Sequence, residues 1–438
     1  MALGRPGHPL TTPARSYDKA FSMTTTALAP HPAQRRVLTV LVTAQVLSGA
    51  GLAAGVTVGA LLAQDMLGGA GWAGLPSALF TIGSAAAAAL IGRTSQRLGR
   101  RTGLAAGYAA GALGAVGVVA AATLGSVVLL FASLFVYGAG TATNLQARYA
   151  GADLATPPQH RGRALSTVMV ATTLGAVVGP NLVTQLGDLA RAMGIPVLAG
   201  PFLLAAAAYA SAGLVLWLLL RPDPLTTARA EAALPQPTAA TTPGSAAIAA
   251  NTRMLVLGAA VMVLSQLVMV AIMNMTPVHM TGHGHSVGAA GLVIAVHVAA
   301  MFLPSPLSGF LVDRLGRLPV AAASGVTLLA AGLLAALAPP HSVGLLALAL
   351  ALLGLGWSFG IVSGTAIVTD AVPLATRAKT QGTVDVAIAV AGAGGGLASG
   401  LVVAAGSYAV LSLTGGVLAL AVLPAIVWTA RPGIASHS

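Results

Sequence analysis

The feature that most constrains this chain is a succession of long apolar segments that runs through almost all of its 438 residues. A helix that spans a lipid bilayer needs roughly 20 mainly apolar residues, and about twelve such segments can be marked. Lipid offers no hydrogen-bond partner to backbone amides, so each segment is expected to be an α-helix. The expected spans are 37–63, 72–92, 103–124, 126–149, 164–187, 196–220, 254–277, 287–310, 319–338, 343–368, 381–404 and 407–430.

Composition agrees with that arrangement and excludes a water-soluble protein. Of all residues, 56% are hydrophobic and only 7% are charged, and the mean hydropathy is +0.89. A soluble core cannot bury that much apolar surface. The 54 glycines and 25 prolines would suggest disorder in water, but in lipid they are typical of close helix contacts and kinks. The chain is therefore expected to be an all-α membrane protein.

The basic residues that give the chain its net charge of +12 are placed as in a membrane protein. Nearly all of those in loops precede the first span or follow the second, fourth, sixth, eighth and tenth, and basic loops mark the cytoplasmic side of a membrane. Only Arg191 lies in an outward loop, and Arg148 lies within or at the end of the fourth span. We therefore expect an inner-membrane protein with both termini in the cytoplasm and no nucleic-acid partner. Cysteine is absent, which excludes disulfides and thiolate sites. The basic loop residues are Arg35, Arg36, Arg93, Arg97, Arg100, Arg101, Arg161, Arg163, Arg221, Arg229, Arg253, Arg314, Arg317, Arg377 and Lys379.

Two polar, proline-bearing stretches divide the chain. Residues 1–34 are expected to be a disordered cytoplasmic tail, and 222–252 a flexible cytoplasmic linker between two halves of six spans each. The halves cover 35–221 and 253–430, and residues 431–438 form a second cytoplasmic tail.

The two halves repeat each other at a nearly constant spacing. Gly92 recurs 217 residues later as Gly309, and Asp153 recurs at the same spacing as Asp370. Six spans separate the copies, so the repeat keeps its orientation relative to the membrane. Two parallel repeats of six helices are the architecture of the major facilitator superfamily, which this chain resembles.

The segment from Gly309 to Arg317 resembles the superfamily's signature loop between the eighth and ninth helices, and the segment from Gly92 to Arg101 is its copy between the second and third. The resemblance implies a cytoplasmic network of charges that closes the outward-facing state; such charges can latch two helix bundles and release as they rock. The first copy has Gln96 where an acidic residue is expected, so its latch should be weaker. The expected gating residues are Gly92, Arg97, Gly99, Arg100, Gly309, Asp313, Arg314, Gly316 and Arg317.

The fifth span carries Gly175 and Gly179 one turn apart, followed by Pro180. This is similar to the motif of proton-coupled drug antiporters of the superfamily. Small residues one turn apart also let helices approach closely, and proline bends a helix. The motif indicates either antiport or close helix packing.

Residues 254–301 concentrate side chains that bind soft metal ions: seven of the 12 methionines and four of the 9 histidines fall there. Met269 and Met273 are one turn apart in the seventh span, and His297 and Met301 in the eighth, so each pair shares a helix face. Thioether sulfur selects monovalent copper and imidazole tolerates it, whereas magnesium and calcium require oxygen ligands. Neutral ligands also favour release, which a carrier needs.

These pairs resemble those of the CcoA-type copper importers, a subfamily that bears Met-x-x-x-Met on the seventh helix and His-x-x-x-Met on the eighth. The resemblance implies that Met269, Met273, His297 and Met301 move copper, and that the protein supplies a copper-containing terminal oxidase. Copper, free or in a small chelate, is then the substrate, no cofactor is expected, and the carrier is a monomer among membrane lipids. Packing methionines and a histidine bonded to a backbone carbonyl are the alternatives.

The connection between the two spans holds further ligands. His279, Met280, His283 and His285 lie on the expected outer side, where they are candidates for collecting copper before import. A polar loop rich in turn-forming residues is the alternative.

Ionisable groups at membrane depth are candidates for coupling transport to protons, because charges within spans usually pair or carry protons. Asp385 lies near the start of the eleventh span, and Arg148 and Asp153 lie near the end of the fourth. A structural ion pair is the alternative for Asp385.

Three functional hypotheses follow. Copper import by alternating access is favoured. The alternatives are a proton-coupled antiporter of a small organic or drug-like compound and a non-transporting membrane sensor that binds metal. An enzyme is not expected, because the sequence contains no phosphate-binding loop, no Gly-x-Ser-x-Gly elbow and no zinc-protease motif.

Overall fold

A computed structural model of the chain describes residues 31–67, 74–157, 160–234 and 245–430. These residues form helices joined by short loops, without a strand among them. In the described residues each expected span falls on one helix or on two consecutive helices, and ten helical segments of this part are long and apolar enough to cross a membrane. The expected all-α membrane class is therefore confirmed.

The helices of each half follow one another in chain order. The first half contains α1 (Gln34–Leu67), α2 (Gly74–Leu98), α3 (Arg100–Leu124), α4 (Val127–Ala152), α5 (Arg161–Asn181), α6 (Val183–Ala192), the 3-10 helix η3 (Val197–Ala199) and α7 (Gly200–Leu219). After α8 (Pro224–Ala232), the second half contains α9 (Ser245–Gly282), α10 (Val287–Phe302), α11 (Ser305–Leu315), α12 (Arg317–Leu337), α13 (Val343–Ala371), α14 (Arg377–Ala405), α15 (Tyr408–Ala419) and α16 (Val422–Ala430).

Two expected spans of the second half are each broken into two helices near a proline. The eighth span divides into α10 and α11, and the twelfth into α15 and α16. Pro306 follows Phe302 by four residues, and Pro424 follows Leu420 by four. A proline ring clashes with the carbonyl four residues earlier and lacks an amide hydrogen, so the helical hydrogen-bonding pattern is interrupted at these points.

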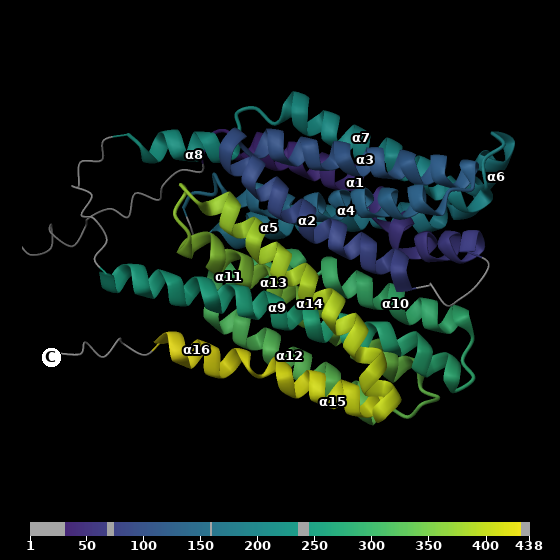
Figure 1. Cartoon of the computed structure of the whole chain (residues 1–438). Helices are drawn as coiled ribbons and strands as arrows, with labels where there is room; N and C mark the ends of the chain where they lie inside the picture. Colours follow the sequence, from purple (N-terminus) through teal and green to yellow (C-terminus); the bar gives the residue numbers. More distant parts are fainter. Residues whose placement is uncertain (1–30, 68–73, 158–159, 235–244, 431–438) are drawn as a thin grey trace, which may run out of the picture.

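The two halves lie side by side along their length. Figure 1 shows α1 to α7 together in its upper part and α9 to α16 in its lower part, with α8 at the left and α6 at the right. We call the end that holds α8 the linker end, and the other the opposite end. Across the boundary, α2 packs on α14 and α5 packs on α11.

The segments expected to be unstructured are only partly described. The expected linker, 222–252, contains α8 and the beginning of α9. Residues 1–30, 235–244 and 431–438 lie outside the described residues.

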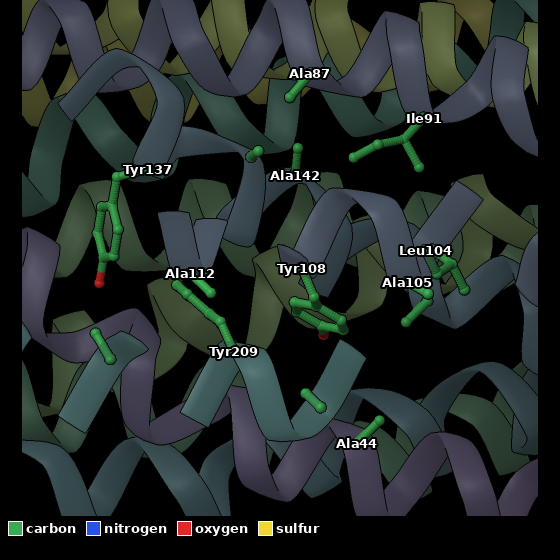
Figure 2. Close-up of a cluster of buried hydrophobic side chains, with 14 of the residues drawn as sticks. Ala44, Ala87, Ile91, Leu104, Ala105, Tyr108, Ala112, Tyr137, Ala142 and Tyr209 are labelled. Carbon is green, nitrogen blue, oxygen red and sulfur yellow. The ribbon is translucent and has the colours of Figure 1, made fainter. Parts of the chain in front are cut away.

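Three tyrosines on different helices fill the core of the first half. Tyr108, Tyr137 and Tyr209 are fully buried, and the ring of Tyr209 lies 5.8 Å from that of Tyr108 and 5.6 Å from that of Tyr137. Figure 2 shows these rings among alanine side chains. A side chain at Gly140 would collide with the Tyr209 ring, so this glycine makes room for an aromatic residue between helices.

The core of the second half extends across the boundary. Its cluster of buried apolar residues includes Trp357 and Ile388, and also Leu165 and Met169 of α5. The halves therefore share an apolar contact in addition to the polar contacts of the linker end.

Candidate functional site

The linker end is closed by two matching pairs of close helix contacts. A Cβ atom placed on Gly92 of α2 would lie 2.8 Å from the carbonyl oxygen of Ala378 and 2.9 Å from the Cα of Gly382, both in α14. In the second half, a Cβ atom on Gly309 of α11 would collide with the carbonyl oxygen of Gly162 in α5. Gly92 and Gly309 are the repeated glycines of the signature loops, so the repeat places one glycine at each crossing.

Gln96 and Asp313 cap the first turns of helices in the opposite half. Asp313 accepts hydrogen bonds from the backbone amides of Gly162 (2.8 Å) and Arg163 (3.0 Å) at the beginning of α5. Gln96 Oε1 accepts from the amides of Ala378 (2.7 Å) and Lys379 (3.3 Å) at the beginning of α14. Each side chain therefore satisfies amides that a helix leaves unpaired at its start.

Gln96 also uses its amide nitrogen, which a carboxylate lacks. Nε2 donates to the carbonyl oxygens of Ala375 (2.5 Å) and Leu374 (3.3 Å), in the turn before α14. Gln96 stands where the family pattern has an acidic residue, and a weaker latch is expected there. The geometry does not support that expectation. The Gln96 side chain accepts the same kind of hydrogen bonds as a carboxylate and donates two more.

Charged residues surround these caps. Asp370 pairs with Arg161 across the boundary and with Arg317 within its own half. Asp153 pairs with Arg100 at 2.8 Å, with both side chains fully buried, and lies 3.8 Å from Arg377 of the other half. Asp153 is therefore part of the closed linker end.

The remaining expected gating residues have different surroundings. Gly99 and Gly316 adopt φ angles of +91° and +97° directly before α3 and α12, a backbone conformation that favours glycine. Arg314 lies against the ring of Phe310, and Arg97 is exposed without an ion pair to any described residue.

The linker helix α8 forms hydrogen bonds with both halves at this end. Asp223 caps α8 by accepting from the amides of Leu225 and Thr226, and it also accepts from the amide of Arg101 (2.7 Å). Arg229 donates to the carbonyl oxygen of Gln96 (2.9 Å) in the first half and to that of Leu374 (3.2 Å) in the second. Sequence reasoning missed Arg229, because the residues around it indicate only a polar, proline-bearing linker.

A buried ion pair crosses the boundary deeper in the bundle. Arg148 Nη2 of α4 lies 2.7 Å from Asp385 Oδ1 of α14, and Arg148 Nε donates to Thr365 Oγ1 of α13 (3.1 Å). Tyr149 also donates to Asp385 Oδ1 (3.2 Å). Within the described part of the chain, Asp385 Oδ2 is buried and has no hydrogen-bond partner. Two of the three coupling candidates thus meet, while Asp153 pairs elsewhere.

The four residues expected to bind copper lie in the second half. Met269, His297 and Met301 are buried and Met273 is half-buried. The three methionines belong to the buried cluster of that half or pack against it. A Cβ atom on Gly354 of α13 would lie 2.9 Å from the amide nitrogen of Met301, so this glycine lets α10 approach α13 closely.

The imidazole of His297 has one partnered and one unpartnered nitrogen. Nδ1 lies 2.8 Å from the carbonyl oxygen of Leu350, whereas Nε2 is buried and has no hydrogen bond to any described residue. Because a carbonyl only accepts, the proton of the neutral ring lies on Nδ1, and Nε2 keeps its lone pair. The alternative of a carbonyl-bonded histidine is therefore realised, but it leaves a buried nitrogen able to bind a ligand.

The residues expected to collect copper do not form one cluster. The ring of His279 lies 4.4 Å from those of His283 and Tyr408. His285 bonds instead to the carbonyl oxygen of Pro340 (2.7 Å), and Met280 is buried in the apolar core. Across the described residues, no three His, Asp or Glu side chains are grouped so as to hold a metal ion.

The glycine motif of the fifth span is partly described. A side chain at Gly175 would collide with the carbonyl oxygen of Val46 in α1, which agrees with the close-packing interpretation. The side-chain surroundings of Gly179 and Pro180 lie outside the described part, and α5 ends one residue after that proline.

Comparison with known proteins identifies relatives over most of the chain. The family model of the Major Facilitator Superfamily matches residues 41–303 and 255–437. An uncharacterised MFS-type transporter, YdeG of Bacillus subtilis (strain 168), is 59% identical over 396 residues, which cover 90% of this chain and 92% of the relative. The riboflavin transporter RfnT of Brucella anthropi is 35% identical over 359 residues, covering 81% and 85%.

Solved structures share the fold at low sequence identity. The transporter FucP in its outward conformation superposes with a TM-score of 0.69 at 18% identity, covering 90% of this chain and 98% of that one. A bacterial homologue of the iron transporter ferroportin, in its outward-facing state, superposes with a TM-score of 0.62 at 16% identity, covering 90% and 100%.

Proposed function

Because the chain belongs to the major facilitator superfamily of membrane transporters, we propose that it carries a small solute between its two halves and that this solute is monovalent copper. The observation that carries the proposal is the buried, unpartnered Nε2 of His297. Histidines that bind metals commonly donate their other ring N–H to a carbonyl or carboxylate, which fixes the ring and its tautomer. The hydrogen bond to Leu350 provides that second contact.

The methionine sulfur atoms of the same half favour a soft ion. Met269, Met273 and Met301 offer three thioethers in the half of the molecule that contains His297, and thioethers favour monovalent copper over hard cations. None of these ligands is charged, so the site would hold copper without a strong electrostatic trap. We propose that all four side chains bind the ion in at least one transport state.

The proposed route runs from the opposite end to the linker end. His279 and His283, with rings 4.4 Å apart near the end of α9, are the proposed first contact for copper. The linker end is closed by Gln96, Asp313 and Arg229, so release there requires these contacts to break. From the pattern of basic loops we propose that the linker end faces the cytoplasm; the proposed direction is then import across the inner membrane. The proposed recipient is a copper-containing terminal oxidase.

The buried pair of Arg148 and Asp385 is the proposed coupling element. It joins α4 to α14, so opening the linker end separates an arginine from its carboxylate. An isolated buried carboxylate is costly in its charged form, and taking up a proton removes that cost. We therefore propose that a proton binds Asp385 during the transition.

A second candidate cargo is a planar organic solute such as riboflavin. The relative named as a riboflavin transporter favours it, as does a polar aromatic group in the second half. There the Trp357 indole donates to Gln266 Oε1 (2.8 Å) and packs edge-on against Phe302 at 5.6 Å. Such a group suits stacking and hydrogen bonding to a flat heterocycle.

One uptake experiment separates these candidates. Cells with and without the protein are supplied with radiolabelled copper or radiolabelled riboflavin, and accumulation is followed over time. The copper proposal expects protein-dependent copper accumulation that is lost in His297→Ala. Riboflavin accumulation without copper accumulation would favour the second candidate, and copper binding without uptake of either would favour a sensor.

A further inference from the structure

A groove on the outside of the first half is independent of the proposed cargo site. It lies between α2 and α3, with α4 as its floor, and encloses about 270 Å³. Its α2 side runs from Gly83 to Thr94, and its α3 side includes Gly103 and Ala106. Eleven helical steps of 1.5 Å make it roughly 16 Å long, so it extends from mid-bundle toward the linker end.

Small residues create the groove, and apolar residues line it. A Cβ atom on Gly83 would collide with the backbone of Phe135, and one on Gly107 would lie 2.7 Å from Ile91 Cδ1. Gly83 therefore lets α2 lie close to α4, and a side chain at Gly107 would enter the space beside Ile91 of α2. Leu90, at the rim, is 60% exposed. In a membrane-spanning segment such a groove faces lipid chains.

Two unpaired positive charges follow the groove at its linker end. Thr94 is its last lining residue on α2, and Arg97 lies one turn further along the same helix face. Arg93 and Arg97 are exposed and make no hydrogen bond or ion pair with a described residue. Their neighbours are engaged: Arg100 pairs with Asp153, and Arg101 stacks on Trp217 at 4.4 Å.

We propose that this groove binds an anionic phospholipid from the leaflet at the linker end, with one acyl chain between α2 and α3 and the phosphate at Arg97 and Arg93. The Thr94 hydroxyl is placed to donate to the same headgroup. Basic residues beside grooves between membrane helices are a known means of holding anionic lipids. The bound lipid would lie against α2, the helix that meets α14 at Gly92.

The test is a lipid titration of the purified full-length protein in detergent by native mass spectrometry. The probes are phosphatidylglycerol and phosphatidylcholine with identical acyl chains. We expect tighter binding of phosphatidylglycerol. Arg97→Gln should weaken that binding by about fivefold and the double variant with Arg93→Gln by about thirtyfold, since one arginine contributes about a fivefold factor near a membrane surface. Phosphatidylcholine binding should be unchanged in both.

Matched controls separate the groove from general surface charge. Arg36→Gln removes another exposed arginine, at the beginning of α1, and should leave the preference intact. Ala106→Phe, which fills the groove, should weaken both lipids, whereas Val116→Phe changes an exposed residue of α3 outside the lining and should not. Any of three results would overturn the proposal. The first is an equal loss of phosphatidylglycerol binding in Arg36→Gln and Arg97→Gln, and the second is normal lipid binding in Ala106→Phe. The third is full competition of phosphatidylglycerol binding by inorganic phosphate.

Discussion

Gln96 caps α14 in the same way that Asp313 caps α5. Each side chain accepts from the amides of the second and third residues of a helix in the other half. The two residues are separated by 217 positions, the spacing of the internal repeat. The linker end is therefore closed by a pseudo-symmetric pair of caps, of which one is an acid and the other an amide.

The chemistry of the amide leads to the first prediction. Gln96→Glu keeps the acceptor but turns a carboxylate oxygen toward the carbonyl oxygens of Leu374 and Ala375, which now receive hydrogen bonds. Leaving such groups unpaired costs about 1–3 kcal/mol each. We therefore expect the linker end to open more often in this variant. The measurement is the rate of alkylation of a cysteine introduced at Ala88, which is buried and adjoins Gly382. The rate should rise.

The absence of native cysteine makes that readout specific to the introduced thiol. Asp313→Asn is the matched control, because an amide at that position still accepts from the amides of Gly162 and Arg163. Faster alkylation in Asp313→Asn than in Gln96→Glu would contradict the role given to the Gln96 donor.

The second prediction concerns the linker helix. Arg229→Gln removes hydrogen bonds that α8 makes with both halves, and hydrogen bonds from charged groups contribute about 1.5–3 kcal/mol. Alkylation at Ala88→Cys should therefore become at least tenfold faster. Arg221→Gln changes an exposed arginine directly before the linker and should have no effect; similar rates in the two variants would show that α8 does not hold the linker end closed.

The third prediction tests the glycine crossing. Gly92→Val places carbon atoms where α14 already lies, with the first of them 2.8 Å from the Ala378 carbonyl oxygen. Overpacking of this kind costs about 1–3 kcal/mol, so the closed linker end should become less populated in spin-label distance measurements. Gly394→Val is the control, since a Cβ atom there meets nothing within 4 Å. An unchanged distance distribution in Gly92→Val would refute the close contact.

The fourth prediction concerns the buried ion pair. Asp385→Asn leaves the Arg148 guanidinium without its carboxylate, and breaking a buried pair costs about 3–5 kcal/mol. The melting temperature of the purified protein should fall markedly. Arg148→Met combined with Asp385→Leu removes both charges and should restore most of the stability. If the single variant melts like the parent protein, the pair does not hold α4 and α14 together.

Much of the fold could be predicted from sequence, because apolar length and basic loops depend on local composition alone. The repeat spacing also matched Gly92 with Gly309, and the structure places each of them at a close helix contact between the halves. The family pattern emphasises charge and so predicts a weaker latch at Gln96, whereas a helix start requires only an acceptor, which the Gln96 amide supplies. The contacts of Arg229 could not be predicted, since they depend on how α8 folds back on the bundle.

Sequence was likewise a limited guide to the four residues proposed to bind copper. Spacing placed Met269 with Met273 and His297 with Met301 on common helix faces, but the rotation of each helix depends on its neighbours. The approach of α10 to α13 at Gly354 turns the His297 Nδ1 toward Leu350. Burial likewise removes Met280 from the outer surface, although its sequence neighbours are polar.

Cellular copper accumulation tests the central claim most directly. Radiolabelled copper uptake is compared in cells that contain the parent protein, Met273→Leu or Met275→Leu, at matched protein levels in the membrane. Each variant removes one sulfur while keeping the size of the side chain, and Met275 lies outside the proposed site. We predict that uptake is lost in Met273→Leu and retained in Met275→Leu. Copper uptake by Met273→Leu equal to that of the parent protein would contradict the proposed site.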